Sequence, residues 1–562
     1  MSDAASQERA NTPRMSGGHA IVKTLAERGV DTVFGLPGVQ TYSLFDGLAD
    51  RSEAIRTVNA RHEFGVGYMA YGYARATGRI GVASVVPGPG VLNASSALNT
   101  ANMTATPMLM ATGQIPSTYV GRGRGHLHEM PDQLATLRTL TKHAERIDHP
   151  NQAPRAVNQA IDIAVSGRPG VASLEMAWDV MNQMAPVASE EAGGPPATPA
   201  PDPDDIDRAA NLIKKAEAPL IFVGGGAQDA AGVIQQLAER LGAPVASNRM
   251  GRGVLSSDHE LAVNSFTSHA LWQKCDLMIA IGTRLELPGM RWTNYLRDVP
   301  RPPEPKLVRI EVCPVEMRRI PTDAPVLADA AAGVSALLER FPEDESARRA
   351  WRDTAATTKA ETLAAVRENV QPQVQFLDAI REVMPRDSIF VEEISQMGFT
   401  AALTYPVYGP RQYVSSGMQG ALGYGVPTAV GVQAADPDRP VVLVTGDGGF
   451  MFGLQEIAAA AEQGLNVITV IVNNAGYANV RRDQQRIFDG RDYKSTFAAM
   501  DYVKLGEALG ARSWKADTPE AVKASLNEAL GAGAPSLIEI NLAPGVEAPP
   551  WPYIFPAGPA EA

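Results

Sequence analysis

Along most of the chain, runs of β-branched and other apolar residues alternate with longer segments whose apolar positions recur at helical spacing. The clearest example lies in the last third. Val441–Thr445 predicts a buried strand, Phe452–Gln463 predicts a helix, and Val467–Val472 predicts a second buried strand. Gly446–Gly449 predicts a tight turn between the first strand and the helix. This order is a βαβ unit, from which parallel α/β sheets are built.

Polar residues follow both strands of this unit. Asp447 comes after the first strand, and Asn473-Asn474 follows the second. Open α/β sheets bind ligands at the carboxyl ends of their strands. Glycines there let the backbone approach a diphosphate, and the start of the following helix offers free N–H groups to the same anion. These side chains are too few to enclose a cation, but Mg²⁺ is commonly held by one or two protein groups together with phosphate oxygens and water. The unit therefore predicts a site for a metal-diphosphate cofactor.

The first part of the chain repeats the alternation. His19–Arg28 predicts a helix, Thr32–Phe34 and Ile55–Val58 predict strands, and a second helix is expected from Glu63 through Arg75. Glu63 thus lies where a strand ends and a helix begins. Considered alone it has a simple explanation, because the helix dipole stabilises an acidic residue in the first turn.

Changes in composition divide the chain into domains. Pro186–Asp205 is rich in proline, alanine and acidic residues and predicts a linker, and Phe341–Gln375 predicts a charged, partly helical connector. We therefore predict an α/β fold with parallel sheets in three domains, at 15–185, 205–340 and 370–545. The remaining tail, 546–562, is rich in proline and aromatic residues. It fits a lid over a site, a strap across a partner subunit, or a disordered surface segment.

The overall composition excludes several classes of protein. Of 562 residues, 45% are hydrophobic and 20% are charged, and no apolar run reaches the roughly 18 residues of a membrane span. The net charge of −12 argues against a nucleic-acid partner, because such proteins present a basic face. The first residues form a polar lead-in without an apolar signal core, and only Cys275 and Cys313 are cysteines, which fits a reducing compartment. We therefore expect a cytoplasmic protein.

Four segments together resemble the thiamine-diphosphate (ThDP) enzyme family. Twenty-four residues, Gly449–Val472, separate the G-D-G sequence from the N-N pair, as in the signature of that family. The strings RHEFGVGYMAYGYARATG from Arg61, VVPGPGVLNASSALNTANMTATPMLMATGQIP from Val85 and SSGMQGALGYGVPTAVG from Ser415 also resemble family segments. The resemblance implies two related ThDP-binding domains, one for the pyrimidine and one for the diphosphate, on either side of a Rossmann-like middle domain.

The resemblance also implies roles for individual residues. Glu63 would bind and activate the cofactor, because a carboxyl group hydrogen-bonded to the pyrimidine ring favours the imino tautomer that takes the thiazolium proton. Gln114 would be an active-site hydrogen-bonding group. Leu422, which alone would be an ordinary core leucine, would hold the cofactor in its bent form. The other implied cofactor-binding residues are Gln396, Gly446, Gly448, Gly449 and Asn474, and the implied metal ligands are Asp447, Asn474 and the Gly476 carbonyl.

Within the family, the chain resembles acetolactate synthase, a 2-oxo acid decarboxylase and carboligase. Thr141-Lys142-His143 resembles a segment of that enzyme whose lysine lies near the substrate, although a solvated basic pair is an equal interpretation. Two positions depart from the pattern. Leu127 replaces an aromatic residue, and Asp483 aligns with a tryptophan that selects the acceptor 2-oxo acid. A carboxylate in place of a large apolar wall would change which acceptor is tolerated.

The loop GRGRGHLHEMPDQ contains His126 and His128. These histidines are candidate acid-base groups beside the cofactor, and with Arg122 and Arg124 they are candidates for binding an anionic substrate. A mobile polar loop explains the same residues equally well.

The middle domain contains a predicted strand followed by Gly224-Gly225-Gly226, without the full G-x-G-x-x-G fingerprint of dinucleotide sites. The resemblance leaves two uses open for this domain. It could be a structural module, or it could bind FAD or an adenine nucleotide.

We therefore predict a ThDP- and Mg²⁺-dependent enzyme that decarboxylates a 2-oxo acid and transfers the product to an acceptor. The alternatives are an enzyme like 2-hydroxyacyl-CoA lyase or oxalyl-CoA decarboxylase, and an FAD-linked enzyme like pyruvate oxidase. A non-catalytic scaffold is disfavoured because Glu63 and Asp447 are both present. In this family the cofactor lies between the first domain of one subunit and the third of another. The resemblance thus implies a homodimer or homotetramer with its active site at the subunit interface.

Overall fold

The computed structural model describes residues 12–287, 304–341 and 348–556. They divide into two compact units. Unit one contains the chain up to Ala197 together with Val426–Pro437 and Gly453–Leu465, and unit two contains the rest. Two short segments from the third predicted domain therefore pack with the first. Most of the predicted N-terminal lead-in and the last residues of the tail lie outside the described residues.

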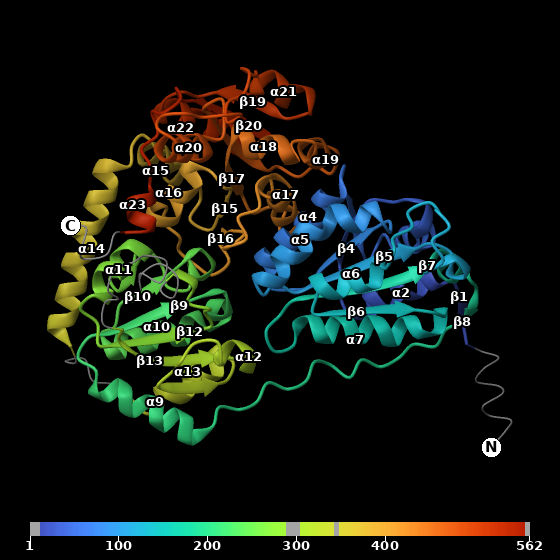
Figure 1. Ribbon diagram of the computed structural model, residues 1–562, viewed down its shortest axis with the longest axis horizontal. Coiled ribbons are helices and arrows are strands. Elements are labelled where there is room, and N and C mark those ends of the chain that lie inside the picture. The colour runs from blue at the N-terminus through green and yellow to red at the C-terminus, as the bar shows by residue number, and fades with distance from the viewer. Residues whose placement is uncertain (1–11, 288–303, 342–347, 557–562) are drawn as a thin grey trace. The chain divides into compact units, whose positions relative to one another are not determined.

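Unit one is built on a six-stranded parallel sheet in the order β3-β2-β4-β5-β7-β6, with helices over both faces (Figure 1). The strands are β2 (Thr32–Gly35), β3 (Arg56–Asn59), β4 (Gly81–Val85), β5 (Met108–Gln114), β6 (His143–Ile147) and β7 (Val171–Ala177). The helices are α2 (Gly17–Glu27), α3 (Tyr42–Asp50), α4 (Glu63–Thr77), α5 (Pro89–Met103), α6 (Gln133–Leu140), α7 (Ala153–Val165) and α8 (Trp178–Asn182). A short antiparallel pair, β1 (Arg14–Met15) and β8 (Ala185–Pro186), ties the two ends of this region together. Every residue of β5 and β7 is buried, which explains their continuous apolar runs.

Unit two contains a second parallel sheet in the order β16-β15-β17-β18-β20-β19. Its strands are β15 (Ile389–Glu392), β16 (Tyr413–Val414), β17 (Val441–Gly446), β18 (Ile468–Asn473), β19 (Arg512–Lys515) and β20 (Ser536–Asn541). Its helices are α15 (Gln373–Val383), α16 (Gln396–Thr404), α18 (Asp447–Gly453), α20 (Ala478–Ile487), α21 (Tyr502–Ala508), α22 (Pro519–Leu530) and α23 (Trp551–Ile554). The two sheets, this one and that of unit one, have the same topology. When the strands of each sheet are counted in chain order, their spatial order from one edge is second, first, third, fourth, sixth and fifth. The identical topology confirms that the first and third domains are related.

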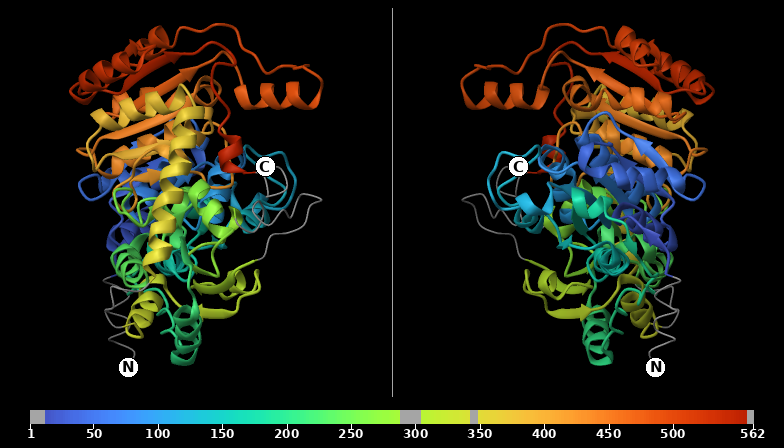
Figure 2. Two further views of the ribbon diagram at one scale, coloured as in Figure 1. Left: turned by 90° about the vertical axis from the view of Figure 1, so that its left-hand side faces the viewer. Right: turned by 90° about the vertical axis from the view of Figure 1, so that its right-hand side faces the viewer.

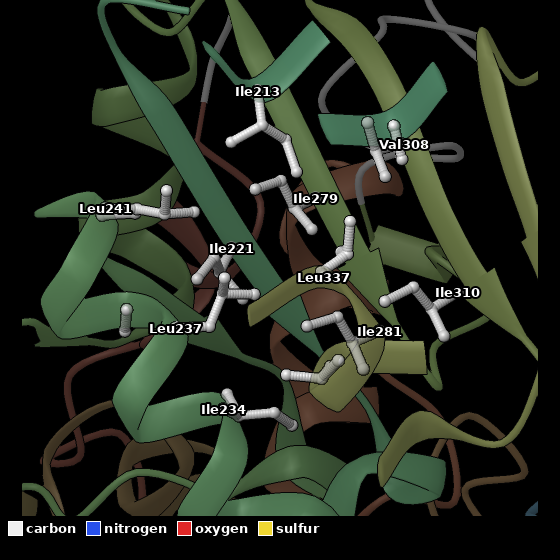
Figure 3. Close-up of a cluster of buried hydrophobic side chains, with 14 of the residues drawn as sticks. Ile213, Ile221, Ile234, Leu237, Leu241, Ile279, Ile281, Val308, Ile310 and Leu337 are labelled. Atoms are coloured by element: carbon white, nitrogen blue, oxygen red, sulfur yellow. The ribbon is translucent and has the colours of Figure 1, made fainter. Parts of the chain in front are cut away.

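The middle sheet, also in unit two, has the order β11-β10-β9-β12-β13-β14, which is the strand order of Rossmann folds. Its strands are β9 (Pro219–Val223), β10 (Val245–Ser247), β11 (Ala262–Val263), β12 (Leu277–Ile281), β13 (Lys306–Glu311) and β14 (Ala324–Leu327). Its helices are α9 (Pro203–Lys215), α10 (Ala231–Leu241), α11 (Ser265–Trp272), α12 (Pro314–Met317) and α13 (Ala330–Leu338). Figure 3 shows its core, where Ile221 and Ile279 of the strands meet Leu237 and Leu337 of the helices. The prediction of three parallel-sheet α/β domains is confirmed.

The predicted segments between the domains are present with shifted limits. Residues 187–202 contain no helix or strand, whereas α9 begins at Pro203, inside the predicted linker. The connector is largely one long helix, α14 (Arg349–Asn369), drawn in yellow in Figure 2. It contacts α11 of the middle domain and α16 of the third. Within the described residues, no helix has the length and apolar character that crossing a membrane requires.

One local prediction is wrong. Gly446–Gly449 is not a tight turn, because α18 begins at Asp447 directly after β17. The acidic residue and the glycines form the first turn of a helix. The predicted helix Phe452–Gln463 is accordingly divided into α18 and α19 (Glu456–Glu462), and α19 belongs to unit one, as does most of α17 (Gly425–Ala435).

Candidate active site

A pocket lies at the carboxyl end of the third sheet, within unit two. β15 and β17 are neighbours there, and the chain leaves them on opposite sides of the sheet, toward β16 and toward β18. Such a switch point is where open α/β sheets bind ligands. The pocket is lined by residues that follow β15, β17 and β18, by Leu422, and by Glu547 of the tail. Every residue that the sequence assigned to the diphosphate and the metal lines it: Gln396, Leu422, Gly446, Asp447, Gly448, Gly449, Asn474 and Gly476.

Asp447 and Asn474 bring oxygen atoms to this pocket. Asp447 is 2% exposed, and its Oδ2 accepts a hydrogen bond from the Gly476 N–H at 3.0 Å. Burial raises the pKa of Asp447 to about 6, against the opposing effect of backbone hydrogen bonds. The Nδ2 of Asn474 donates to Oε2 of Glu547 at 2.6 Å, whereas its Oδ1 is buried without a hydrogen-bond partner. A buried amide oxygen without a partner is costly, and it fits a cation as its missing neighbour.

The donor set fits a cation that also binds phosphate. Among the described residues, no group of three or more His, Cys, Asp or Glu side chains could hold a metal. One carboxylate and one amide would leave most of an octahedral shell to other oxygens, and Mg²⁺ bound with a diphosphate is held in that way. Asp447, Asn474 and Gly476 therefore remain the predicted ligands, and these residues suit the role.

The glycines of α18 make close approach to their neighbours possible. A Cβ atom on Gly448 would lie 2.7 Å from Cε1 of Tyr477, so any side chain there would force the Tyr477 ring to move. Glycine is favoured at this position by packing, and the same feature lets an anion approach the helix.

Gln396 and Leu422 reach the same pocket from other elements. Gln396 is the first residue of α16, is 5% exposed, and has a buried carboxamide oxygen without a partner. Because the carboxamide can be rotated to present N–H instead, it fits a phosphate oxygen as partner. Leu422 precedes Gly423, which has a φ of +87° and would place a Cβ against Phe452. A tight turn thus presents Leu422 to the pocket.

Glu393 supports this turn and was not identified from the sequence. It is fully buried, and its carboxylate accepts backbone N–H groups of Gly425 at 2.7 Å, Ile394 at 3.1 Å and Gly423 at 3.2 Å. One side chain therefore joins the end of β15 to the segment that carries Leu422. Burial raises the pKa of Glu393 to about 7.

The raised pKa of Glu393 predicts a pH dependence of stability. The native chain keeps a proton on Glu393 between about pH 4.5 and 7 that the unfolded chain has lost, so raising the pH through this window lowers the free energy of unfolding by roughly 3 kcal/mol. Glu393→Gln lacks this titration. We expect the melting temperature of Glu393→Gln, relative to wild type, to be higher at pH 8 than at pH 5, measured without cofactor. The exposed Glu361→Gln is the control, and an equal difference at both pH values would contradict the assignment.

The C-terminal tail packs on its own unit at the rim of the pocket. Trp551 Nε1 donates to Oδ1 of Asn479, a pocket residue, at 2.9 Å. Its ring lies 4.7 Å from that of Phe399 and 5.3 Å from that of Phe555, centroid to centroid. Glu547 lines the pocket, and burial raises its pKa to about 7. The described part of the tail is therefore packed and ordered at the pocket rim, and its role as a lid or a strap remains a prediction.

Trp551→Ala should loosen this tail. The substitution removes the ring contacts with Phe399 and Phe555 and the hydrogen bond to Asn479, so segments beyond β20 should open more often. We expect limited proteolysis, followed by mass analysis, to cleave the tail at least about 10-fold faster. Trp514→Ala, which removes a ring from a different cluster, is the matched control. Equal cleavage rates for the two variants would contradict the docking.

Glu63 lies in unit one at the carboxyl end of the first sheet. It is the first residue of α4, directly after the β3 loop, and its carboxylate is partly exposed. Asn93 Nδ2, from α5, donates to Glu63 Oε2 at 3.0 Å. The interaction holds the side chain from one side and leaves the second oxygen available to a ligand. The predicted helix through Arg75 is confirmed.

The structure places the other three first-domain candidates in different surroundings. Gln114 is 3% exposed, and its Nε2 donates to Glu175 at 3.2 Å while its Oε1 accepts the Ile115 N–H. His128 Nδ1 lies 2.8 Å from Gln40 Oε1, and a Cβ on Gly88 would touch the His128 carbonyl. Since Gly88 lies near the start of the same helix as Asn93, the His128 backbone approaches the Glu63 side of the sheet.

His126 differs from His128. Its Nδ1 is buried without a partner, and its ring lies 5.0 Å from that of Tyr119. Neighbouring Leu127 is 57% exposed. The contact with Gln40 thus holds the His128 ring, whereas Nδ1 of His126 has no hydrogen-bond partner. The roles of both histidines remain predictions.

Lys142 is exposed, as expected of a solvated basic residue, and it also makes contacts that the sequence did not predict. Its Nζ donates to the backbone carbonyls of Ile163, Ser166 and Arg168 at 2.6, 2.6 and 3.1 Å. These carbonyls lie at and just beyond the C-terminal end of α7, where a cation is stabilised by the helix dipole. Lys142 is a helix cap, which a short sequence string could not reveal because the carbonyls it binds lie 21 to 26 residues farther along the chain.

In the middle domain, Gly224–Gly226 follows β9 at the switch point between β9 and β12. Gly226 N donates to the Gly282 carbonyl at 3.0 Å, and a Cβ on Gly224 would lie 2.5 Å from the same oxygen. The two strand ends therefore pack backbone against backbone. A bound FAD or adenine nucleotide stays a prediction.

Comparisons with known proteins agree with this geometry. Models of thiamine pyrophosphate (ThDP) enzymes match three segments of the chain: the N-terminal TPP binding domain at 15–136, the central domain at 206–337 and the C-terminal TPP binding domain at 393–540. A protein named probable 2-ketoarginine decarboxylase from Pseudomonas aeruginosa is 31% identical over 94% of both chains. The chain belongs to the thiamine pyrophosphate enzyme family.

Other relatives of this ThDP enzyme are acetolactate synthases. The large subunit from Corynebacterium glutamicum is 31% identical over 98% of this chain and 90% of the relative. The large subunit of isozyme 1 from Escherichia coli is 27% identical over 96% of both chains. The N-terminal model covers Glu63, Gln114, His126 and His128, and the C-terminal model covers the pocket residues except Glu547.

Proposed function

We propose that this ThDP enzyme uses ThDP with Mg²⁺ to break or form a carbon–carbon bond next to a carbonyl group. The observation that carries the proposal is the pair of buried, partnerless oxygens, Asn474 Oδ1 and Gln396 Oε1, beside Asp447 in a glycine-lined pocket. Asp447, Asn474 and the Gly476 carbonyl would hold the metal. Gln396 and the N–H groups of Gly448 and Gly449 would bind the diphosphate.

The remaining residues would orient the reaction. Glu63 would hold and move a proton at the pyrimidine ring, where its free carboxylate oxygen is available. Leu422 would provide the apolar support that keeps the two rings of the cofactor close. The bound cofactor supplies an electron sink for the bond next to the substrate carbonyl. The chain itself thus supplies binding, orientation and one proton-transfer group.

The substrate we propose is a 2-oxo acid, decarboxylated and then joined to an acceptor carbonyl as in acetolactate synthase. The names of the relatives, acetolactate synthase and 2-ketoarginine decarboxylase, support this class over the CoA-linked and FAD-linked alternatives. His126 and His128, with Gln114, remain the candidates for contacts with the substrate.

A second candidate is decarboxylation without joining, acting on a 2-oxo acid with a cationic side chain. Two carboxylates favour it. Glu547 lines the pocket, and Asp483 lies on α20, one turn after the pocket residues Asn479 and Val480. Asp483 is 45% exposed and pairs with the adjacent Arg482 at 2.9 Å. An acidic pocket rim would suit the cationic side chain of 2-ketoarginine, the compound named in the name of one relative.

We further propose a homodimer or homotetramer in the cytoplasm, with the active site completed at the subunit interface. The family resemblance supports this assembly, because the cofactor there contacts the first domain of one subunit and the third of another. Mass photometry gives the stoichiometry. A monomer that turns over substrate would contradict the shared site.

The deciding experiment supplies purified protein with ThDP, Mg²⁺ and either pyruvate or 5-guanidino-2-oxopentanoate, and follows CO₂ release and products by mass spectrometry. Acetolactate from pyruvate supports the first proposal. CO₂ and an aldehyde from the guanidino acid, reduced in Asp483→Asn, support the second. No CO₂ from either substrate, although ThDP and Mg²⁺ raise the melting temperature, would reject both substrate proposals and keep the cofactor proposal.

A further inference from the structure

A buried carboxylate outside the pocket lies against the start of the helix that carries Glu63. Glu456, the first residue of α19, has no exposed surface. Its Oε2 accepts a hydrogen bond from the backbone N–H of Arg61 at 2.9 Å. Both residues belong to unit one, and Arg61 lies two positions before α4 begins at Glu63. Glu456 therefore binds the chain just ahead of Glu63.

The packing around Glu456 is tight. Gly65 lies in the first turn of α4, and a Cβ atom there would lie 2.5 Å from Cδ of Glu456 and closer still to Oε1. Because Gly65 has no side chain, the Glu456 carboxylate can pack directly against α4. Burial raises the pKa of Glu456 to about 7, against the opposing effect of the backbone hydrogen bonds from Arg61 and His62. Gly65 and Glu456 are thus two halves of one contact, although they are far apart in the sequence.

The direction of Glu63 depends on the same short segment. His62 is the N-cap of α4, and its Nδ1 accepts the Phe64 N–H at 3.1 Å. Glu63 follows immediately, so its side chain leaves the backbone where Arg61 and His62 place it. In catalysis, a misplacement of about 1 Å can cost about 100-fold in rate.

We propose that Glu456 is a positioning residue for Glu63. Its carboxylate fixes the backbone at Arg61 and thereby sets where α4 begins and how Glu63 points. The proposal rests on the proposed function for the role of Glu63, whereas the hold of Glu456 on α4 stands independently of any activity. Glu456 itself is not a catalytic residue, because it contacts backbone and not the reacting groups.

A matched control lies on the same helix. Glu462, at the other end of α19, pairs with the Arg61 guanidinium at 2.7 Å, and both side chains are about half exposed. This exposed ion pair contributes little to stability. Glu462→Gln therefore removes a carboxylate from the same helix and from the same partner residue without touching the buried contact.

The first test is hydrogen exchange of the protein without cofactor, at pH 8. In Glu456→Ala, the Arg61 N–H loses its acceptor, and we expect the segment 61–66 to exchange at least about 10-fold faster than in wild type. Glu456→Gln retains an acceptor oxygen and should restore most of the protection. Glu462→Gln should match wild type. Unchanged exchange in Glu456→Ala overturns the proposal whether or not the enzyme turns over a 2-oxo acid.

The second test separates positioning from binding. With ThDP and Mg²⁺ present, Glu456→Ala should lower kcat by about 10-fold or more, with KM and the ThDP dissociation constant within about threefold of wild type. Glu456→Gln should recover most of kcat. Faster exchange with an unchanged kcat overturns the positioning role. A wild-type protein without turnover on any 2-oxo acid overturns the proposed function instead, and the exchange result then stands on its own.

A third test uses the contact itself and starts from a variant that keeps Glu456. Gly65→Ala should lower the melting temperature and kcat, because the new methyl group displaces the Glu456 carboxylate. In the Glu456→Ala background the displaced atoms are gone, so Gly65→Ala should cost much less there than alone. Such strong non-additivity is expected of residues in contact. Additive effects of the two substitutions would overturn the proposal.

Discussion

Replacing Glu63 by glutamine is expected to lower kcat by about 10²- to 10⁴-fold, the range typical of a lost proton-transfer group. Glutamine has the same shape and can still accept the hydrogen bond from Asn93, but its carboxamide cannot take up or release a proton. The affinity for ThDP should therefore stay within about threefold of wild type. Steady-state kinetics and calorimetric titration of the cofactor measure the two effects separately.

The control for Glu63→Gln is Glu53→Gln, which changes an exposed glutamate ahead of β3. It should leave both kcat and cofactor affinity unchanged. If Glu63→Gln lost ThDP binding, Glu63 would be a structural contact and not the proton-transfer group. If kcat were unchanged, the role assigned from the family resemblance would be wrong.

Replacing Asp447 by asparagine is expected to abolish Mg²⁺-dependent cofactor binding, with a loss of affinity of about 100-fold or more. The amide oxygen can still accept the Gly476 N–H, so the local backbone should persist. The charge that a divalent cation requires is absent, however. We expect ThDP and Mg²⁺ to raise the melting temperature of wild type clearly and that of Asp447→Asn hardly at all.

The same substitution should have the opposite effect without cofactor. Burial raises the pKa of Asp447 to about 6, so the ionised carboxylate is disfavoured by its surroundings. At pH 8 the asparagine variant should melt at the same temperature as wild type or higher. The exposed Asp438→Asn is the control and should change neither measurement. A destabilised cofactor-free variant would show that Asp447 has a structural role in place of a metal role.

Much of the fold could be predicted from the sequence because its signals are local. Buried strands such as β17 and β18 are short apolar runs with turn residues at their ends, and the prediction placed them within one residue. The spacing of Asp447 and Asn474 follows from one βαβ unit, whose length is fixed by one strand and the helical segment before it. Glu63, Asp447 and Asn474 could therefore be assigned from contiguous strings.

Residues that act across the fold were missed. Glu393, Glu456 and Glu547 are single acidic residues with no motif around them, and their roles arise from backbone N–H groups or an amide brought to them by other elements. Their nearest signal was a glycine elsewhere in the chain, such as Gly425 or Gly65. A glycine shows that space is needed without showing what occupies it. Only the folded structure shows which acidic residue occupies the space beside each glycine.

The start of α18 is a case in which a local string led to a wrong expectation, and Lys142 has contacts that its local string did not reveal. The lysine caps a helix formed by residues farther along the chain. The glycines after β17 suggested a turn, since glycine disfavours helices by about 1 kcal/mol relative to alanine. Tertiary packing outweighs that preference, because Gly448 fits against the Tyr477 ring, which a Cβ atom would displace.

The sequence by itself determined the class of the fold and the family, and it predicted the groups that would meet a metal and a diphosphate, because each depends on residues close together in the chain. The tertiary structure alone decided which side chains hold those groups in place. It showed that Asn474 is oriented by the tail, that Leu422 is presented by a turn bound to Glu393, and that α19 packs with the first domain. These contacts join distant segments through burial and backbone hydrogen bonds, and their partners are set by the folded chain as a whole.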